Sequence, residues 1–252
     1  MLRIEVVTLF PELVEKVTRH GMPRIAVEQR ALSLALRNPR DFSQNKWRRV
    51  DDRPYGGGPG MVMEAEPLKL AIGAAKQELG ARARVLMLSP QGERFTQAWA
   101  ERLAAEQELI LVCGRYEGVD ERLLAQEVDV ELSLGDFVLS GGELAAMAVI
   151  DAIARLLPGV LGSGESAPND SFAQAGRLDH PHYTRPEAWS GAPVPEVLLG
   201  GDHAKVARWR LKQALGATWL KRPALLEGLQ LGEVETGLLR EFIAEQAGSV
   251  KR

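Results

Sequence analysis

The sequence has one cysteine, no long hydrophobic run and no excess of basic charge, and each shortage excludes a class of protein. Cys113 cannot form an internal disulfide, and no CxxC pair is present to hold zinc. The longest apolar run, residues 144–150, is far shorter than the roughly 18 residues that span a bilayer. No basic stretch precedes an apolar one at the N-terminus, so no secretion signal is expected. The sequence therefore predicts a cytoplasmic protein without a membrane segment.

The balance of charge is slightly acidic, because 31 Lys and Arg stand against 34 Asp and Glu, which gives −3. Such a chain is not the uniformly basic body expected of a nonspecific nucleic-acid binder. Residues 203–226 differ, since they carry only basic charges: Lys205, Arg208, Arg210, Lys212, Lys221 and Arg222. This stretch can present a local phosphate-binding surface.

Alternating strand and helix patterns predict the fold class. The composition, 45% hydrophobic and 26% charged, is that of a globular protein, and 252 residues suit one large domain or two modest ones. Compact apolar runs predict strands at residues 3–10, 31–37, 84–89 and 108–113. Helical patterns occupy residues 67–80, 96–106 and 119–127. The alternation predicts an α/β domain with a mostly parallel sheet and helices on both faces.

A largely buried helix is predicted at residues 140–157. Its opening Ser-Gly-Gly-Glu is a capping box, in which the side chain of Glu143 would reach back to the backbone of Ser140. We expect this helix to be buried apart from one seam. The seam consists of Glu143, Met147, Asp151 and Arg155.

The domain boundary is predicted after this helix. Residues 161–176 are rich in Gly, Ser, Ala, Asn and Asp without periodicity, which is typical of a linker. The expected organisation is an α/β domain at 1–160, this linker, and a small, mainly helical domain at 177–252. Helical patterns in the second domain lie at 202–215, 223–230 and 234–247.

Glycine-bearing turns are the most promising binding features. Residues 54–60, PYGGGPG, allow close approach of backbone to another molecule, although a flexible connector explains them equally well. No GxxxxGK[ST] or GxGxxG is present, which disfavours a P-loop and the usual dinucleotide fold. Three further turns follow apolar runs, at 89–92, 114–118 and 135–142. Because ligands of α/β sheets bind beyond the carboxyl ends of strands, these turns can converge on one pocket suited to a flat heterocycle such as adenine.

Several polar residues allow two interpretations. Arg155 can pair with Asp151 one helical turn earlier, and Asp170 can simply cap a helix. His180 and His182 suggest a metal, but the neighbouring prolines favour a rigid turn and no zinc spacing is present. The run RWRLK around Trp209 interleaves an aromatic with cations, as nucleic-acid surfaces do, while Trp209 can also serve the core.

Taken together, these segments resemble the bacterial tRNA (guanine-N1)-methyltransferases, members of the knotted SPOUT class. The resemblance spans nearly the whole chain and preserves the family's order. It rests on FPE at 10–12, NPRDF at 38–42, and residues 51–63, 88–92, 114–122, 134–147, 156–162, 170–172, 181–186 and 209–216.

The resemblance implies a trefoil-knotted N-terminal domain that binds S-adenosylmethionine, and a homodimer with sites at the subunit interface. It implies methylation of the guanosine just 3′ of the anticodon, position 37 of tRNA. By matching motif, the methyl donor would lie against Pro90, Gly114, Tyr116, Gly118, Leu134, Gly135, Asp136, Phe137, Val138, Leu139 and Gly141.

Catalytic roles also follow from the resemblance. Asp170 matches the base that removes the proton from N1, and Arg155 matches the cation that stabilises charge on O6. Mg²⁺ dependence is implied, with Glu117 as a candidate ligand. Arg185 and the basic stretch with Arg208 and Lys212 would hold the anticodon arm. The alternatives are a knotted methyltransferase acting on another RNA position, such as a ribose hydroxyl, and a non-catalytic RNA-binding module.

Overall fold

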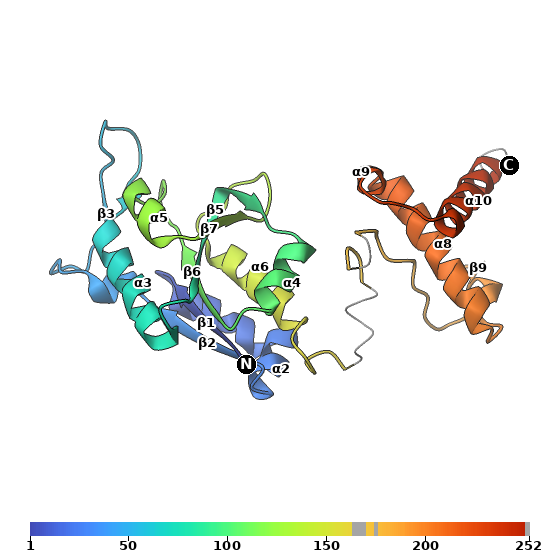
Figure 1. The fold of residues 1–252 in the computed structure, drawn as a ribbon, viewed down its shortest axis with the longest axis horizontal. Helices are drawn as coiled ribbons and strands as arrows, with labels where there is room; N and C mark the ends of the chain where they lie inside the picture. The colour runs from blue at the N-terminus through green and yellow to red at the C-terminus, as the bar shows by residue number, and fades with distance from the viewer. Residues whose placement is uncertain (163–169, 174–175, 250–252) are drawn as a thin grey trace. The chain divides into compact units, whose positions relative to one another are not determined.

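The structure, a computed structural model, describes residues 1–162, 170–173 and 176–249 (Figure 1). The chain divides into two compact units, Met1–Gly164 and Glu165–Arg252, which are described separately. Most of the linker predicted at 161–176 lies outside the described residues. None of the helices in the described residues combines the length and apolar character that crossing a bilayer requires.

A five-stranded parallel sheet forms the centre of the first unit. Its strands are β1 (Leu2–Val7), β2 (Leu32–Arg37), β5 (Arg84–Arg94), β6 (Glu108–Cys113) and β7 (Val130–Ser133). They are ordered β2-β1-β6-β5-β7, and every neighbouring pair is parallel. The parallel α/β sheet predicted from the alternating pattern is therefore confirmed.

Helices cover both faces of this sheet (Figure 1). On one side lie α2 (Gly21–Glu28), α4 (Gln97–Ala104) and α6 (Glu143–Ala154), together with the short α1 (Pro11–Val14) and η1 (Glu15–Arg19). On the other side lie α3 (Ala65–Leu79) and α5 (Glu121–Glu127). Strand β6 shows why its sequence is continuously apolar: Leu109 and Leu111 belong to one core, whereas Ile110 and Val112 belong to the other.

The glycine-rich loop lies between two very short strands. β3 (Asp51–Asp52) pairs antiparallel with β4 (Val62–Met63), and the 3-10 turn η2 (Pro39–Phe42) precedes them. Four glycines of the loop have positive φ, a conformation that glycine adopts without a steric penalty. Tyr55 at its tip is fully exposed. The loop therefore has defined geometry and a large side chain facing solvent.

The predicted cap of the helix at 140–157 is wrong. Helix α6 begins at Glu143, its N-cap is Gly142, and no side chain caps it. Glu143 is 1% exposed, because its carboxylate binds residues from other elements of the first unit instead of the Ser140 backbone. The exposed stripe is also displaced from the predicted seam, since it runs through Leu144, Ala148 and Asp151.

Strand β5 continues past the turn where it was predicted to end. The expected strand at 84–89 extends to Arg94, with a shift in register against β7 between Leu88 and Glu93. A bulge therefore replaces the predicted turn. Gly92 allows this close passage, because a Cβ there would lie 2.4 Å from the backbone carbonyl carbon of Glu131 in β7.

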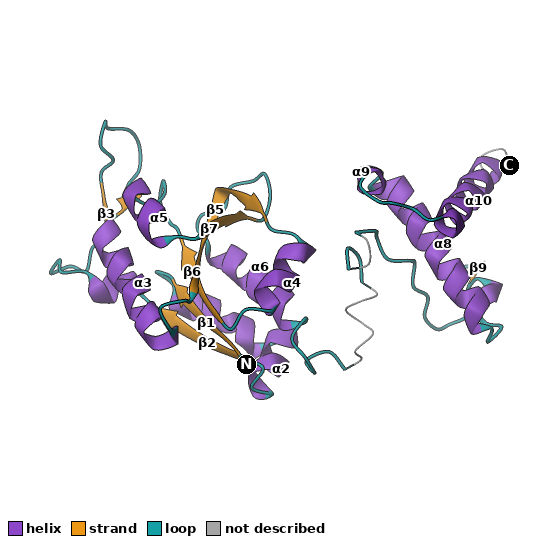
Figure 2. Cartoon of the chain, in the orientation of Figure 1, coloured by secondary structure: helices purple, strands orange, loops and turns teal. Residues whose placement is uncertain are grey.

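The second unit consists mainly of helices (Figure 2). Its elements are β8 (Ala188–Trp189), β9 (Ala192–Pro193), η3 (Glu196–Leu198), α8 (His203–Lys221), α9 (Ala224–Glu227) and α10 (Glu233–Ser249). Asp202 caps α8 by accepting hydrogen bonds from the amides of Ala204 and Lys205. Helices α8 and α10 pack closely, with the Phe242 ring directly over Gly216. Glycine at position 216 allows this packing, because a Cβ there would lie 2.4 Å from atoms of the Phe242 ring.

Candidate functional site

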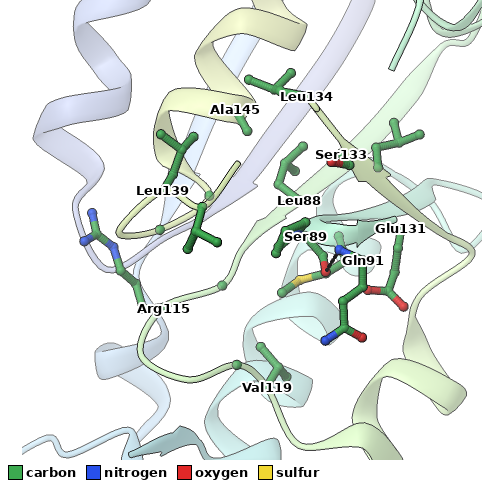
Figure 3. Close-up of a pocket in the computed structure, with 18 of the residues that line it drawn as sticks. Leu88, Ser89, Gln91, Arg115, Val119, Glu131, Ser133, Leu134, Leu139 and Ala145 are labelled. Atoms are coloured by element: carbon green, nitrogen blue, oxygen red, sulfur yellow. Dashed lines mark hydrogen bonds between the residues drawn. The ribbon is translucent and has the colours of Figure 1, made fainter. Parts of the chain in front are cut away.

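One cavity of about 300 Å³ lies beyond the carboxyl ends of β6 and β7 and against the bulge of β5 (Figure 3). Residues from all three glycine-bearing segments predicted to converge line it: 89–91, 114–118, 135 and 137–142. Figure 3 shows side chains from each segment, including Gln91, Arg115 and Leu139. This is the edge of a parallel sheet at which α/β proteins bind ligands, and the volume suits a small molecule.

The walls of the cavity differ in character. Apolar side chains include Leu88 at the base of the β5 bulge, Leu134 after β7, and Ala145 on α6. Three acidic residues, Glu117, Glu121 and Glu131, also line it. The cavity can therefore bury a flat apolar group at one wall and stabilise positive charge at another.

Two of the lining segments are joined through their backbones. Gly142 donates its amide hydrogen to the carbonyl oxygen of Gly114 at 2.9 Å, and Arg115 and Gly141 form an isolated antiparallel bridge. A Cβ at Gly142 would lie 2.8 Å from the Cα of Cys113. Glycine is thus required where α6 starts, because the last residue of β6 passes directly beneath it.

Arg115 is the main charged link between the segments. Its Nε donates to Oε2 of Glu143 at 2.9 Å, and its Nη1 donates to the carbonyl oxygen of Ser140 at 3.0 Å. Oε1 of Glu143 accepts from Thr8 Oγ1 at 2.9 Å, and the Arg115 guanidinium lies 4.4 Å from the centre of the Phe10 ring. The buried carboxylate is therefore satisfied by one cation and one hydroxyl.

Helix α5 forms another wall and is fixed by its cap. Asp120 accepts a hydrogen bond from the backbone amide of Arg122, and it also binds the Arg122 guanidinium. The guanidinium hydrogen bond, followed by the backbone one, lowers the pKa of Asp120 to about 2. Asp120 is therefore ionised throughout the neutral range, and its negative charge interacts favourably with the positive N-terminal end of helix α5.

The one cysteine lies beneath the cavity and is inert. Cys113 is fully buried at the end of β6. Burial, and next the charge of Glu143, raise the pKa of its thiol well above the ordinary value. Because the thiolate is the nucleophilic form, Cys113 supplies no nucleophile at neutral pH.

The residues predicted to bind the methyl donor line the cavity, with one exception. Asp136 is not among its lining residues, and its side chain is 99% exposed and points to solvent near Arg94. A neighbour in sequence can face the other way, so the donor contact expected of Asp136 stays a prediction. The sequence reasoning also missed Arg115 and Glu143 as a pair, since nothing local connects residues 28 positions apart.

The two predicted catalytic residues belong to different units. Arg155 is the half-buried residue that ends α6 in the first unit. Asp170 lies half-buried in a turn of the second unit, and its carbonyl oxygen accepts from the amide of Ala173 at 3.2 Å. The alternative in which Asp170 caps a following helix does not hold, because residues 170–173 form a turn. The amide of Phe172 donates to the carbonyl of Arg177, which steadies that turn.

The predicted phosphate-binding residues differ in their surroundings. Arg208 Nη2 lies 2.5 Å from Oε1 of Glu241, and Lys212 Nζ lies 2.7 Å from Oε1 of Glu245. These pairs connect α8 to α10, so the charges of Arg208 and Lys212 are partly neutralised within the protein. Arg185 is exposed in the segment before β8.

Candidate metal ligands were also expected. Glu117 lines the cavity, but no group of three ligating side chains includes it among the residues that the structure describes. The one such group found there is Asp179, His180 and His182 in the second unit.

Comparison with known proteins shows what the chain is similar to. Residues 2–228 match the family model described as tRNA (Guanine-1)-methyltransferase TrmD. A tRNA (guanine-N(1)-)-methyltransferase of Halorhodospira halophila is 57% identical over 249 residues, which cover 99% of this chain and 94% of that protein. The proteins of the same name from Aeromonas hydrophila and Escherichia coli are each 55% identical. The match to the Aeromonas protein covers 98% of this chain and 99% of that protein. The match to the Escherichia coli protein covers 97% of this chain and 95% of that protein.

Proposed function

The chain belongs to the tRNA (guanine-1)-methyltransferase family, and we propose that it transfers the methyl group of S-adenosylmethionine to N1 of guanosine 37, just 3′ of the anticodon. Methylation of guanine N1 in tRNA is the activity of the family. The observation that carries the proposal is the convergence of three glycine-bearing segments on one cavity at the carboxyl edge of the sheet.

The cavity has the chemistry that S-adenosylmethionine needs. Its apolar wall beside Leu88, Leu134 and Ala145 suits adenine, and backbone groups of the lining segments can hydrogen-bond the ring edges. The carboxylates of Glu117, Glu121 and Glu131 favour the positive charges of the sulfonium and amino groups. When bound, this donor supplies an electrophilic methyl group.

The target nitrogen requires a base and a cation. N1 of guanine carries a proton and is a poor nucleophile until that proton leaves, so Asp170 would accept it. As the proton leaves, negative charge develops on O6, and Arg155 would stabilise it more in the transition state than in the ground state. Asp170 and Arg155 thus divide the work between proton removal and charge stabilisation.

A knot and a homodimer belong to the same proposal. The backbone contacts that join residues 114–118 to 135–142, together with the buried helix α6 that follows, are compatible with a threaded chain. Near the cavity, Phe137, Val138 and Leu144 are apolar and at least half exposed. A second subunit would remove these side chains from water. Light scattering on the purified protein tests the dimer directly.

The second unit, with the linker before it, would hold the anticodon arm. Arg185 is exposed for a phosphate contact, whereas Arg208 and Lys212 would have to exchange their carboxylate partners for phosphates. Mg²⁺ would be held through few protein oxygens, as is usual for this ion, with Glu117 as one of them. A cytoplasmic location, where tRNA is modified, completes the proposal.

The deciding experiment is transfer of tritiated methyl from S-adenosylmethionine to an unmodified tRNA transcript with G37, beside the same transcript with A37. Label in the first alone supports donor, substrate and base together. Label in both contradicts the assigned position. If the G37 product yields a ribose-methylated nucleoside by mass spectrometry, the proposed target atom is wrong. Absence of label from both, with donor binding intact, favours the RNA-binding module.

A further inference from the structure

Three side chains of the second unit meet outside the cavity described above. Asp179, His180 and His182 each offer one ligand atom, and these atoms all lie within 4.8 Å of one another. We propose that these three residues bind a divalent transition-metal ion. This inference concerns binding alone and does not depend on the proposed function.

The ligand atoms already face one another. Nε2 of His182 lies 2.9 Å from Oδ2 of Asp179, and Nε2 of His180 lies 3.7 Å from Oδ1 of the same carboxylate. Nδ1 of His180 lies 3.0 Å from the carbonyl oxygen of Pro181. When Nδ1 carries the proton and donates it to that carbonyl, the lone pair of Nε2 is directed toward the shared centre.

The carboxylate is held in place before any ion arrives. Oδ1 of Asp179 accepts the amide hydrogen of His180 at 2.6 Å, and the amide of Asp179 donates to Oγ of Ser171 at 3.0 Å. The His180 ring packs 4.5 Å from the His182 ring and 6.3 Å from Trp209, measured between ring centres. The site is therefore supported by a second layer of contacts, as metal ligands in proteins usually are.

Burial of the three ligands suits an accessible ion site. The side chains of Asp179 and His180 are 23% and 17% exposed, whereas that of His182 is 71% exposed. Two ligands thus form a fixed base, and His182 leaves a path from solvent. Ligand atoms around one ion at bonds of about 2.1 Å lie roughly 3 to 3.4 Å apart, so small side-chain rotations complete the site.

The ligand set selects the class of metal. Two imidazoles and one carboxylate suit Zn²⁺, Co²⁺ or Ni²⁺, whereas Mg²⁺ prefers a shell of oxygens. Cys113, the one thiol of the chain, does not compete because it is fully buried in the first unit. Bound metal would also brace the contact between Asp179 and Ser171, next to Asp170 in sequence.

The test is Co²⁺ titration of the untagged full-length protein, followed by visible absorption and by calorimetry. We expect one ion per chain, with absorption bands that persist in excess Mg²⁺. His182→Ala and His180→Ala should each weaken binding about tenfold or more. The matched control is His203→Ala, since His203 is an exposed histidine at the start of α8 and should leave binding unchanged.

The outcomes separate a built site from scattered surface histidines. Equal loss of affinity in His203→Ala, or wild-type affinity in the His180→Ala/His182→Ala double variant, overturns the proposal. Circular dichroism of each variant shows whether it is folded. If His180→Ala does not fold, the more exposed His182→Ala still decides the question.

Discussion

The guanidinium of Arg115 lies 2.9 Å from the carboxylate of Glu143, a buried ion pair between the segment after β6 and the first turn of α6. The Arg115 side chain is 20% exposed and that of Glu143 only 1%. Because a second hydrogen bond from the Arg115 side chain reaches the carbonyl oxygen of Ser140, this one side chain fixes two walls of the cavity relative to each other. We therefore expect this pair to contribute both to the stability of the first unit and to ligand binding.

Arg115→Ala should reduce both the stability of the first unit and its affinity for the methyl donor. Removing one partner leaves the Glu143 carboxylate buried with a single hydroxyl donor, at a cost of about 3 kcal/mol in the free energy of unfolding. Urea unfolding measures that loss, and calorimetry with S-adenosylmethionine measures binding. The control is the double variant Arg115→Met/Glu143→Leu, which should recover stability but not donor affinity. Normal affinity in the double variant would show that the pair serves folding only.

Gly142→Ala should distort the junction of β6 and α6. The added Cβ would lie 2.8 Å from the Cα of Cys113, which is backbone and cannot move aside cheaply. We expect a loss of several kcal/mol in unfolding free energy and loss of donor binding. Gly73→Ala is the matched control, because Gly73 lies within α3 with nothing inside 4 Å of a new Cβ. That control should gain up to about 1 kcal/mol, and a similar gain in Gly142→Ala contradicts the packing argument.

Helix α5 should be stabilised by Asp120 in a pH-dependent way. Its pKa is about 2 in the folded protein against an ordinary 3.8, so the stabilisation is fully present above about pH 4 and is lost as the pH falls toward 2. Asp120→Asn keeps a capping oxygen but removes the charge, so it should cost up to about 1 kcal/mol at pH 6, and this difference from the wild type should shrink by pH 3. Urea unfolding at both pH values measures the change. Asp120→Ser also keeps a capping oxygen without the charge. If the difference in the free energy of unfolding between the wild type and Asp120→Ser does not change with pH, the charge argument is wrong.

The proposed tRNA contacts should differ in their contribution to affinity according to the exposure and the ion pairing of each cation. Arg185→Ala should weaken tRNA binding more than Arg208→Ala, since Arg208 is already engaged by Glu241. Filter binding over a range of salt concentrations measures both, and loss of one phosphate contact lowers the salt slope by about 1. Glu241→Gln frees Arg208 and should tighten binding at low salt. Looser binding in Glu241→Gln would mean that the ion pair orients α8 for the RNA.

Local pattern was sufficient for several elements and for the sheet class, but it did not predict the strand β7. The two-faced apolar run of β6 and the helical patterns at 67–80 and 96–106 appear in the structure as a parallel strand and as α3 and α4. Their spatial order was not accessible, because β6 lies between β1 and β5 through pairings that connect distant parts of the chain. Sequence periodicity describes one element at a time and contains no information on which elements pair.

In the candidate site too, local features could be predicted from the sequence and long-range contacts could not. Glycine-bearing turns after apolar runs identified the lining segments, since the need for close backbone approach is a local property. Glu143 was placed in a capping box because Ser-Gly-Gly-Glu fits that motif. A long-range partner was stronger: Arg115 draws the carboxylate into the interior, where leaving either charge alone would be costly. The outward direction of the Asp136 side chain was equally inaccessible, because orientation within a turn depends on what packs around it.

Asp170→Asn should separate chemistry from donor binding. The amide has nearly the same shape but cannot accept the N1 proton, so methyl transfer should fall by roughly 10² to 10⁴ under single-turnover conditions. Donor affinity should be unchanged, because Asp170 is not among the residues that line the cavity and its proposed partner is the guanine. Arg155→Lys keeps a positive charge with different geometry and should lose less activity than Arg155→Ala. Full activity in Asp170→Asn would require another base, whereas equal loss of donor binding would mean that the turn at 170–173 contributes to the cavity in the working enzyme.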